Sequence, residues 1–248
     1  MDILETDAYD RRQKRNMSCA LLFSLLPFFL SAALYFYLWT PDLPASITSA
    51  GVKSAPTLLL AAAVLRWNGG QSVLGVVGGL VFSAVGDCCL VWPELFLHGM
   101  GAFAAAHLLY SITFLSSRYA PYSSSSWNRF LYLILLMVGV GFYIYIYPFL
   151  QKVPNSDMLI PAVGIYVVLI TLMGALAIRT RHTATLLGSL SFMVSDMSLA
   201  LQVFKVIAPI RHGQIIVMVT YYLAQLLIAV GDVKAWENKD DFAKWKRS

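Results

Sequence analysis

Charged residues are scarce in this chain. Asp, Glu, Lys and Arg make up 12% of its 248 residues, about half the share in soluble domains, while apolar residues make up 58%. A soluble globular domain is therefore excluded. Apolar runs long enough to cross a bilayer predict eight transmembrane helices. Their expected ranges are 17–39, 48–65, 72–92, 97–116, 128–148, 158–178, 184–204 and 213–231.

The fold class predicted by these runs is all-α, a polytopic membrane protein with eight transmembrane helices. We expect a basic cytosolic N-terminal tail (1–16), a transmembrane domain (17–233) and a charged cytosolic C-terminal tail (234–248). Lys and Arg concentrate in both tails and in alternate loops, which predicts that both termini are cytosolic. The net charge of +5 then reflects topology and contact with anionic membrane lipids, so no nucleic-acid partner is expected.

Cysteine is also rare, and several catalytic motifs are missing. The three cysteines lie within apolar segments, which argues against a disulfide framework. The chain contains no His-Glu-x-x-His, no Gly-x-Ser-x-Gly and no phosphate-binding glycine loop. His98, His182 and His212 fall at expected loops. We therefore expect no metal site and no cofactor, and neither serine-hydrolase nor nucleotide-driven chemistry.

Two acidic residues interrupt this apolar background. Asp87 and Asp196 are each the only acidic residue in their stretch, and a carboxyl at membrane depth is costly enough to indicate function. Segment 79–90 aligns with segment 188–199, sharing the glycine, the small residue before Asp and the Leu three residues after it. This match predicts a diverged internal four-helix repeat, with both carboxyls at similar depth in parallel helices.

Two neighbouring carboxyls in a low-dielectric site cannot both ionise cheaply. One is then expected to hold a proton while the other stays charged, which gives an acid and base pair. The alternative is structural: either aspartate pairs with Lys53, or with Ser and Tyr hydroxyls, only to join helices. The other polar candidates within the apolar segments are Lys53, His107, Tyr110, Thr220, Tyr221, Tyr222 and Gln225.

These candidates also have plain structural interpretations. A buried His is often a packing residue, a Tyr near a helix end anchors at the membrane surface, and Lys53 can extend towards water. His107 and Tyr110 share one helix face, as do Tyr221 and Gln225. Their expected convergence favours a functional site.

At these residues the chain resembles the lysoplasmalogenase family, the YhhN-like group of eight-span membrane proteins, with its animal liver-type branch as the nearest likeness. The segments that carry the likeness are Val52-Lys53 with Pro56, Ser83-Ala84-Val85-Gly86-Asp87 continuing to Leu90-Val91-Trp92-Pro93, Gly99-Met100 through Phe103 to Ala106-His107-Leu108-Leu109-Tyr110, Ser195-Asp196 with Leu199-Ala200, and Thr220-Tyr221-Tyr222-Leu223-Ala224-Gln225. The resemblance implies hydrolysis of the vinyl ether of lysoplasmalogens at the endoplasmic reticulum, with a lysophospholipid as the partner.

Vinyl ether hydrolysis requires a neutral acid and a nearby anion, roles that Asp87 and Asp196 would fill much as two carboxylates do in glycosidases. Lys53 would meet the phosphate, and the polar groups of helices four and eight would hold water and glycerol hydroxyls. Two rivals remain: a small-molecule or proton-coupled membrane transporter, and an intramembrane aspartyl protease, whose usual Tyr-Asp and Gly-x-Gly-Asp pair is absent here. A homodimer is left open.

Overall fold

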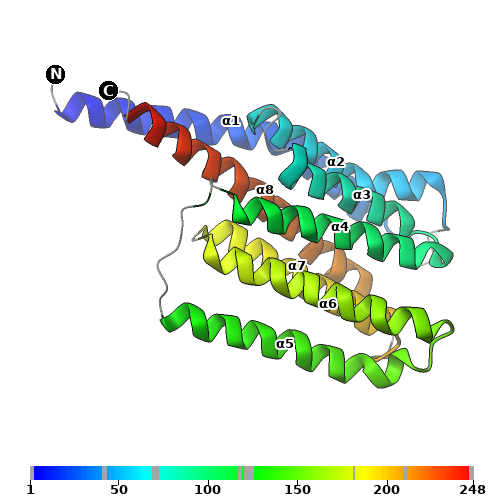
Figure 1. The fold of residues 1–248 in the computed structure, drawn as a ribbon. Coiled ribbons are helices and arrows are strands. Elements are labelled where there is room, and N and C mark those ends of the chain that lie inside the picture. The colour runs from blue at the N-terminus through cyan, green and yellow to red at the C-terminus, as the bar shows by residue number, and fades with distance from the viewer. Residues whose placement is uncertain are drawn as a thin grey trace.

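The computed structural model describes residues 3–40, 44–68, 73–116, 119, 126–180, 182–208 and 212–245. These residues form helices, turns and loops with no strand among them, so the all-α prediction is confirmed. The long helices lie side by side, and both ends of the chain are at the same end of the bundle (Figure 1). The α-helices are α1 Ile3–Leu38, α2 Ile47–Asn68, α3 Gly78–Cys89, α4 Phe96–Leu115, α5 Ser126–Leu150, α6 Ser156–Arg179, α7 Thr183–Val203 and α8 Gly213–Trp245.

Seven of these helices are long and apolar enough to cross a membrane, which makes the chain a multi-pass membrane protein. The remaining apolar helix, Val73–Cys89, is shorter. It begins with a π-helical turn, η2 (Val73–Val77), in which Gly75 has the non-helical angles φ −130° and ψ −119°. The helix expected over 72–92 is thus divided, and a turn and the 3₁₀ segment η3 (Pro93–Leu95) follow it.

The terminal segments extend the first and last helices. α1 begins at Ile3 and α8 continues to Trp245, while the parts that suit a membrane are Asn16–Leu38 and Gly213–Trp236. The described portions of the two expected tails are therefore helical continuations of the spans.

Glycines allow the closest helix contacts. A Cβ on Gly188 of α7 would lie 2.9 Å from the backbone nitrogen of Ile228 and 3.0 Å from the carbonyl oxygen of Ala224, both in α8. Gly79 of α3 likewise faces the ring of Tyr110 in α4 with no room for a side chain. At aligned positions, each glycine brings its helix against the next helix in the chain.

One helix lies at the edge of the bundle. α5 packs mainly against α6, far from α1 and α2 (Figure 1). A small apolar cluster joins α5 and α6 to the end of α7, and it contains Ile146, Leu150, Leu159, Val163 and Phe204. The main apolar core contains residues from each of the helices α1 to α8.

Candidate active site

Asp87 is held between three helices. Its side chain in α3 is 2% exposed. Its Oδ2 accepts a hydrogen bond from the hydroxyl of Tyr221 in α8 at 2.7 Å and a longer one from Thr57 in α2 at 3.4 Å. A buried carboxyl needs such donors because water no longer solvates it. The site around Asp87 therefore links α2, α3 and α8.

Asp196 has a similar set of donors. Its Oδ2 accepts from the hydroxyl of Tyr166 in α6 at 2.6 Å, and Nε2 of His107 in α4 lies 3.2 Å from the same oxygen. Nε2 also lies 2.9 Å from the Tyr166 oxygen. Because Tyr166 donates its own proton to Asp196, Nε2 of His107 is the protonated nitrogen. Nδ1 is buried with no hydrogen-bond partner in the described structure.

The two donor sets correspond to each other across the expected repeat. The interval from Thr57 to Tyr166 equals the interval from Asp87 to Asp196. Each of these hydroxyls lies in the helix before its aspartate. The second partner of each aspartate comes from the opposite half of the chain. Tyr221 of the second half hydrogen-bonds Asp87, and His107 of the first half lies within hydrogen-bond distance of Asp196.

Aromatic rings connect the two sites. The ring centroids of Tyr221 and Phe192 are 5.5 Å apart, and those of Phe192 and His107 are 4.7 Å apart. Phe103 contacts both Tyr221 and Phe192. Within the described part of the chain, no hydrogen bond joins the two carboxyls. The expected single pair is thus two neighbouring carboxyl sites connected by rings packed edge to face.

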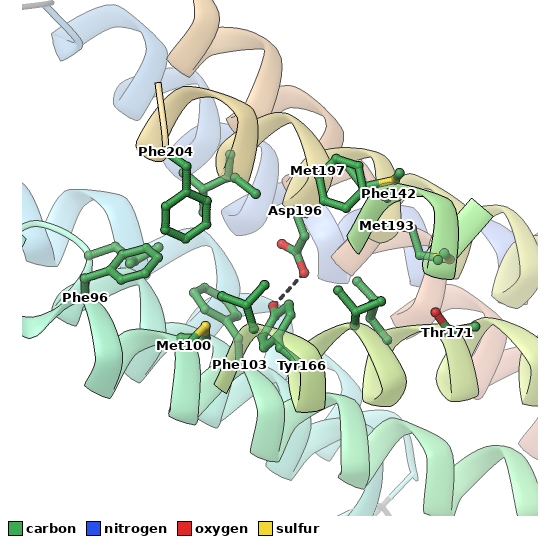
Figure 2. A pocket seen from close by; sticks show the side chains of 17 residues that line it. Phe96, Met100, Phe103, Phe142, Tyr166, Thr171, Met193, Asp196, Met197 and Phe204 are labelled. Atoms are coloured by element: carbon green, nitrogen blue, oxygen red, sulfur yellow. Dashed lines mark hydrogen bonds between the residues drawn. The ribbon is translucent and has the colours of Figure 1, made fainter. Parts of the chain in front are cut away.

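Asp196 lines a groove in the described part of the structure. A groove of about 700 Å³, counting its open mouth, lies among α4, α5, α6 and α7. Its walls are apolar except for Asp196, Tyr166 and Thr171, and Asp87 does not line it. Figure 2 shows the hydrogen bond from Tyr166 to Asp196 at the middle of this groove. The side chain of Asp196 is 15% exposed, so Asp196 is the more accessible carboxyl.

Lys53 and Tyr222 lie near Asp87 without bonding to it. The Tyr222 hydroxyl donates to the backbone carbonyl of Lys53 at 2.7 Å and so connects α8 to α2. Lys53 is 8% exposed and close enough to Asp87 to interact electrostatically, although no ion pair joins them in the described residues. Lys53 thus places a buried amine near the first carboxyl.

The other predicted residues occupy different places. Tyr110 donates to Oε1 of Gln225 at 2.6 Å, and both side chains are fully buried. This pair lies about one turn closer to the end bearing the termini than His107 and Tyr221. Thr220 instead bonds to carbonyls of its own helix at 2.8 and 3.0 Å. Thr220 therefore joins neither carboxyl site.

Sequence reasoning missed Thr57 and Tyr166. Tyr166 interrupts an otherwise apolar stretch of α6. It lies as far after Thr57 in the sequence as Asp196 lies after Asp87, so the expected repeat relates Tyr166 to Thr57. His98, expected in a loop, lies in the first turn of α4 instead. The three cysteines are free. Among the described residues, no group of three His, Cys, Asp or Glu side chains is arranged to hold a metal ion.

This fold and site define a multi-pass membrane protein with two buried carboxyl sites, one of which lies in the wall of an apolar groove. The chain belongs to the YhhN family, whose model matches residues 48–231, from α2 into α8. It is 37% identical to the protein named lysoplasmalogenase TMEM86B of Sus scrofa over 83% of this chain and 84% of that protein.

Two further relatives cover similar shares. The Homo sapiens lysoplasmalogenase TMEM86B is 37% identical over 88% of this chain and 89% of its own. The Bos taurus lysoplasmalogenase TMEM86A is 33% identical over 88% of this chain and 92% of its own. No solved structure matches the chain.

Proposed function

We propose that this protein is a lysoplasmalogenase, which hydrolyses the vinyl ether bond of 1-alkenyl-glycerophosphocholine or 1-alkenyl-glycerophosphoethanolamine. The products are a fatty aldehyde and glycerophosphocholine or glycerophosphoethanolamine. The relatives named lysoplasmalogenase support this substrate class. The structural observation that carries the proposal is the hydrogen-bonded pair of Asp196 and Tyr166 in the wall of an apolar groove.

The reaction consumes one water molecule. It also uses one proton from the protein, which is returned later in the reaction. Protonation of the alkenyl carbon remote from oxygen leaves an oxocarbenium ion at the carbon bonded to oxygen. Water adds to that carbon and loses a proton, which gives a hemiacetal. The hemiacetal collapses to the aldehyde as its bond to the glycerol oxygen breaks, and the proton lost from its hydroxyl is replaced by one delivered to the glycerol oxygen. The reaction therefore needs a proton donor, an anion beside the cation and a base for the water.

In this proposal Asp196 is the carboxyl that meets the alkenyl ether. Both of its hydrogen bonds with described residues fall on Oδ2, so Oδ1 is the oxygen available to substrate or water. Tyr166 lines the groove beside Asp196. Nε2 of His107 contacts both the Tyr166 hydroxyl oxygen and Oδ2 of Asp196. Asp87 is the second carboxyl of the acid and base pair. Because it stands behind Tyr221, its direct participation requires the aromatic rings to move.

The remaining candidates are given supporting roles. The sequence predicts that Lys53 meets the substrate phosphate, but Lys53 is buried beside Asp87 and does not line the groove, so we assign it to the support of Asp87. Tyr110, Tyr221, Tyr222 and Gln225 are already hydrogen-bonded within the protein, which suits residues that hold the helices and carboxyls in place. Thr220, bonded to its own helix, is the weakest of the proposed substrate contacts.

We further propose that Val73–Cys89 is a short eighth span and that the protein resides in the endoplasmic reticulum membrane. With eight spans, both termini lie on the same side, which we propose is the cytosolic side. Two observations support the internal four-helix repeat. The aligned Gly79 and Gly188 each allow close contact with the following helix, and Thr57 and Tyr166 occupy equivalent places beside their aspartates.

A transporter is the second candidate, because broken helices are common around transporter sites. The break at Gly75 is the observation in its favour. However, Gly75 precedes Asp87 by about three helical turns and packs against Thr113, away from either carboxyl. The break therefore does not create a polar site at the bilayer centre.

Aldehyde release by purified protein in detergent, without any gradient, separates the two functions. The substrate is a lysoplasmalogen, and the control is its saturated 1-alkyl ether analogue, which has no double bond to protonate. We expect aldehyde from the vinyl ether alone. No aldehyde from either lipid, under conditions where the protein stays folded, would overturn the proposal.

A further inference from the structure

We propose that the groove binds the hydrocarbon chain of the substrate, with the chain running from Asp196 past Ile170 towards the bilayer centre. The glycerophosphate part then lies at the opposite end, beside Phe96 and Phe204. This inference rests on the proposed function. It adds the orientation of the bound lipid and the residues that determine the preferred length of its hydrocarbon chain.

The groove has two ends, one on each side of its polar pair. Figure 2 shows Phe96 and Phe204 on one side of Asp196 and Thr171 on the other. The two phenylalanine rings pack edge to face with centroids 6.0 Å apart. Ile170 and Met193 line the end near Thr171. A bound lipid with its ether at Asp196 therefore has two directions available for its chain.

The depth of Asp196 decides between these directions. α7 continues for seven residues beyond Asp196, to Val203, and begins thirteen residues before it, at Thr183. At 1.5 Å per residue these distances are about 10 Å and about 20 Å. A charged glycerophosphate must stay close to water, whereas a long hydrocarbon gains from depth. The headgroup therefore takes the short path past Phe204, and the chain takes the long path past Ile170.

The position of α5 explains how a lipid enters. α5 forms the outer wall of the groove with Gly139 and Phe142 and lies at the edge of the bundle (Figure 1). Gly139 has no room for a Cβ beside Thr171 of α6, so the two helices touch closely there. Large apolar side chains on the other faces of α5, such as Met137 at 71% exposure, meet the lipid phase. The groove thus opens beside a single helix directly onto the bilayer.

Ile170→Trp is the test at the chain end, because Ile170 is 6% exposed and lines the groove. Val168→Trp is the matched control, because Val168 is on the same helix, is 66% exposed and does not line the groove. We expect Ile170→Trp to lower kcat/KM for long-chain 1-alkenyl lysophospholipids at least about tenfold while short-chain substrates change less than about twofold. Activity on short chains also shows that the variant folds.

Ala200→Phe is the test at the headgroup end, since Ala200 lines the groove near Phe204. It is expected to lower kcat/KM for short and long chains alike. The reverse pattern, with chain-length dependence at Ala200 and none at Ile170, would overturn the orientation. Equal losses for all chains in Ile170→Trp, or the same losses in Val168→Trp, would overturn the chain site itself.

Binding of saturated 1-alkyl lysophospholipids separates this inference from the proposed function. These lipids are not hydrolysed by vinyl ether chemistry, yet they fill the same groove. We expect the Tm of the wild-type protein to rise with alkyl chain length and this dependence to disappear in Ile170→Trp. If the wild type releases no aldehyde but shows this dependence, the function fails while the lipid site stands; a Tm independent of chain length overturns the lipid site.

Discussion

Tyr166 donates a 2.6 Å hydrogen bond to Asp196, and both side chains face the same groove. With Thr171, they are the polar side chains of an otherwise apolar lining. Tyr166 therefore has two effects to separate: its hydroxyl donates a hydrogen bond to Asp196, and its ring contributes packing.

Tyr166→Phe removes the first effect and keeps the second. We expect kcat to fall between about tenfold and about a thousandfold, with little change in Tm, because a hydrogen bond to the reacting carboxyl is lost. Steady-state kinetics of aldehyde release measure it. Tyr143→Phe is the matched control, since that hydroxyl donates to the carbonyl of Ile160 between α5 and α6. Equal kinetics in the two variants would assign Tyr166 to packing alone.

Asp87→Asn and Asp196→Asn are each expected to lower turnover by about a hundredfold or more, because acid–base catalysis alone contributes about that much. Both variants should fold, since an amide is cheaper than a carboxylate at membrane depth. Asp157→Asn, at the exposed start of α6, is the control. Near-normal aldehyde release from one variant would make that aspartate structural; loss of folding in both would favour the helix-joining interpretation.

Gly188→Leu is expected to lower Tm because its side chain meets the backbone of α8. Overpacking of this kind costs about 1 to 3 kcal/mol of unfolding free energy, and backbone contact places it at the upper end. Gly141→Leu should change Tm little, since a Cβ there meets nothing within 4 Å. Thermal unfolding in detergent compares them. A smaller loss in Gly188→Leu than in Gly141→Leu would contradict the close α7–α8 contact.

Both termini are expected on the cytosolic side. Epitope tags placed before α1 and after α8 should be accessible to antibody when only the plasma membrane of a cell is permeabilised. A tag reached only after the internal membranes are opened would refute this topology.

Activity is expected to survive prolonged treatment with a metal chelator, because the proposed chemistry uses carboxyl, phenol and imidazole groups. Aldehyde release before and after chelation and gel filtration measures this. Complete loss that returns on adding zinc would contradict the metal-free mechanism.

The helices were largely predictable because each span must be apolar over its whole length. The expected ranges 158–178 and 184–204 come within two residues of α6 and α7 at both ends. Asp87 and Asp196 were found for the same reason, since a carboxyl is conspicuous in an apolar run. The break at Gly75 was not predictable from the apolar run alone, and it lies where Gly75 packs closely against Thr113 of another helix.

The contacts of the site were less predictable than its residues. A phenol or imidazole in a helix has several possible neighbours, and its partner depends on the rotation and crossing of whole helices. Tyr221 and His107 were therefore expected to surround one carboxyl pair, whereas each serves a different aspartate. Tyr166 was missed because a single Tyr in an apolar span has an ordinary explanation as a packing residue.

The exchange of donors between the two halves has a consequence for biosynthesis. Spans leave the ribosome in order, and Asp87 is synthesised long before Tyr221, which lies in the last helix. Until that helix is inserted, the buried carboxyl lacks its shorter hydrogen bond and has only Thr57 from its own half. A chain stalled or truncated before α8 would thus carry an incompletely solvated acid in the membrane, a defect that quality-control proteases of the membrane can recognise.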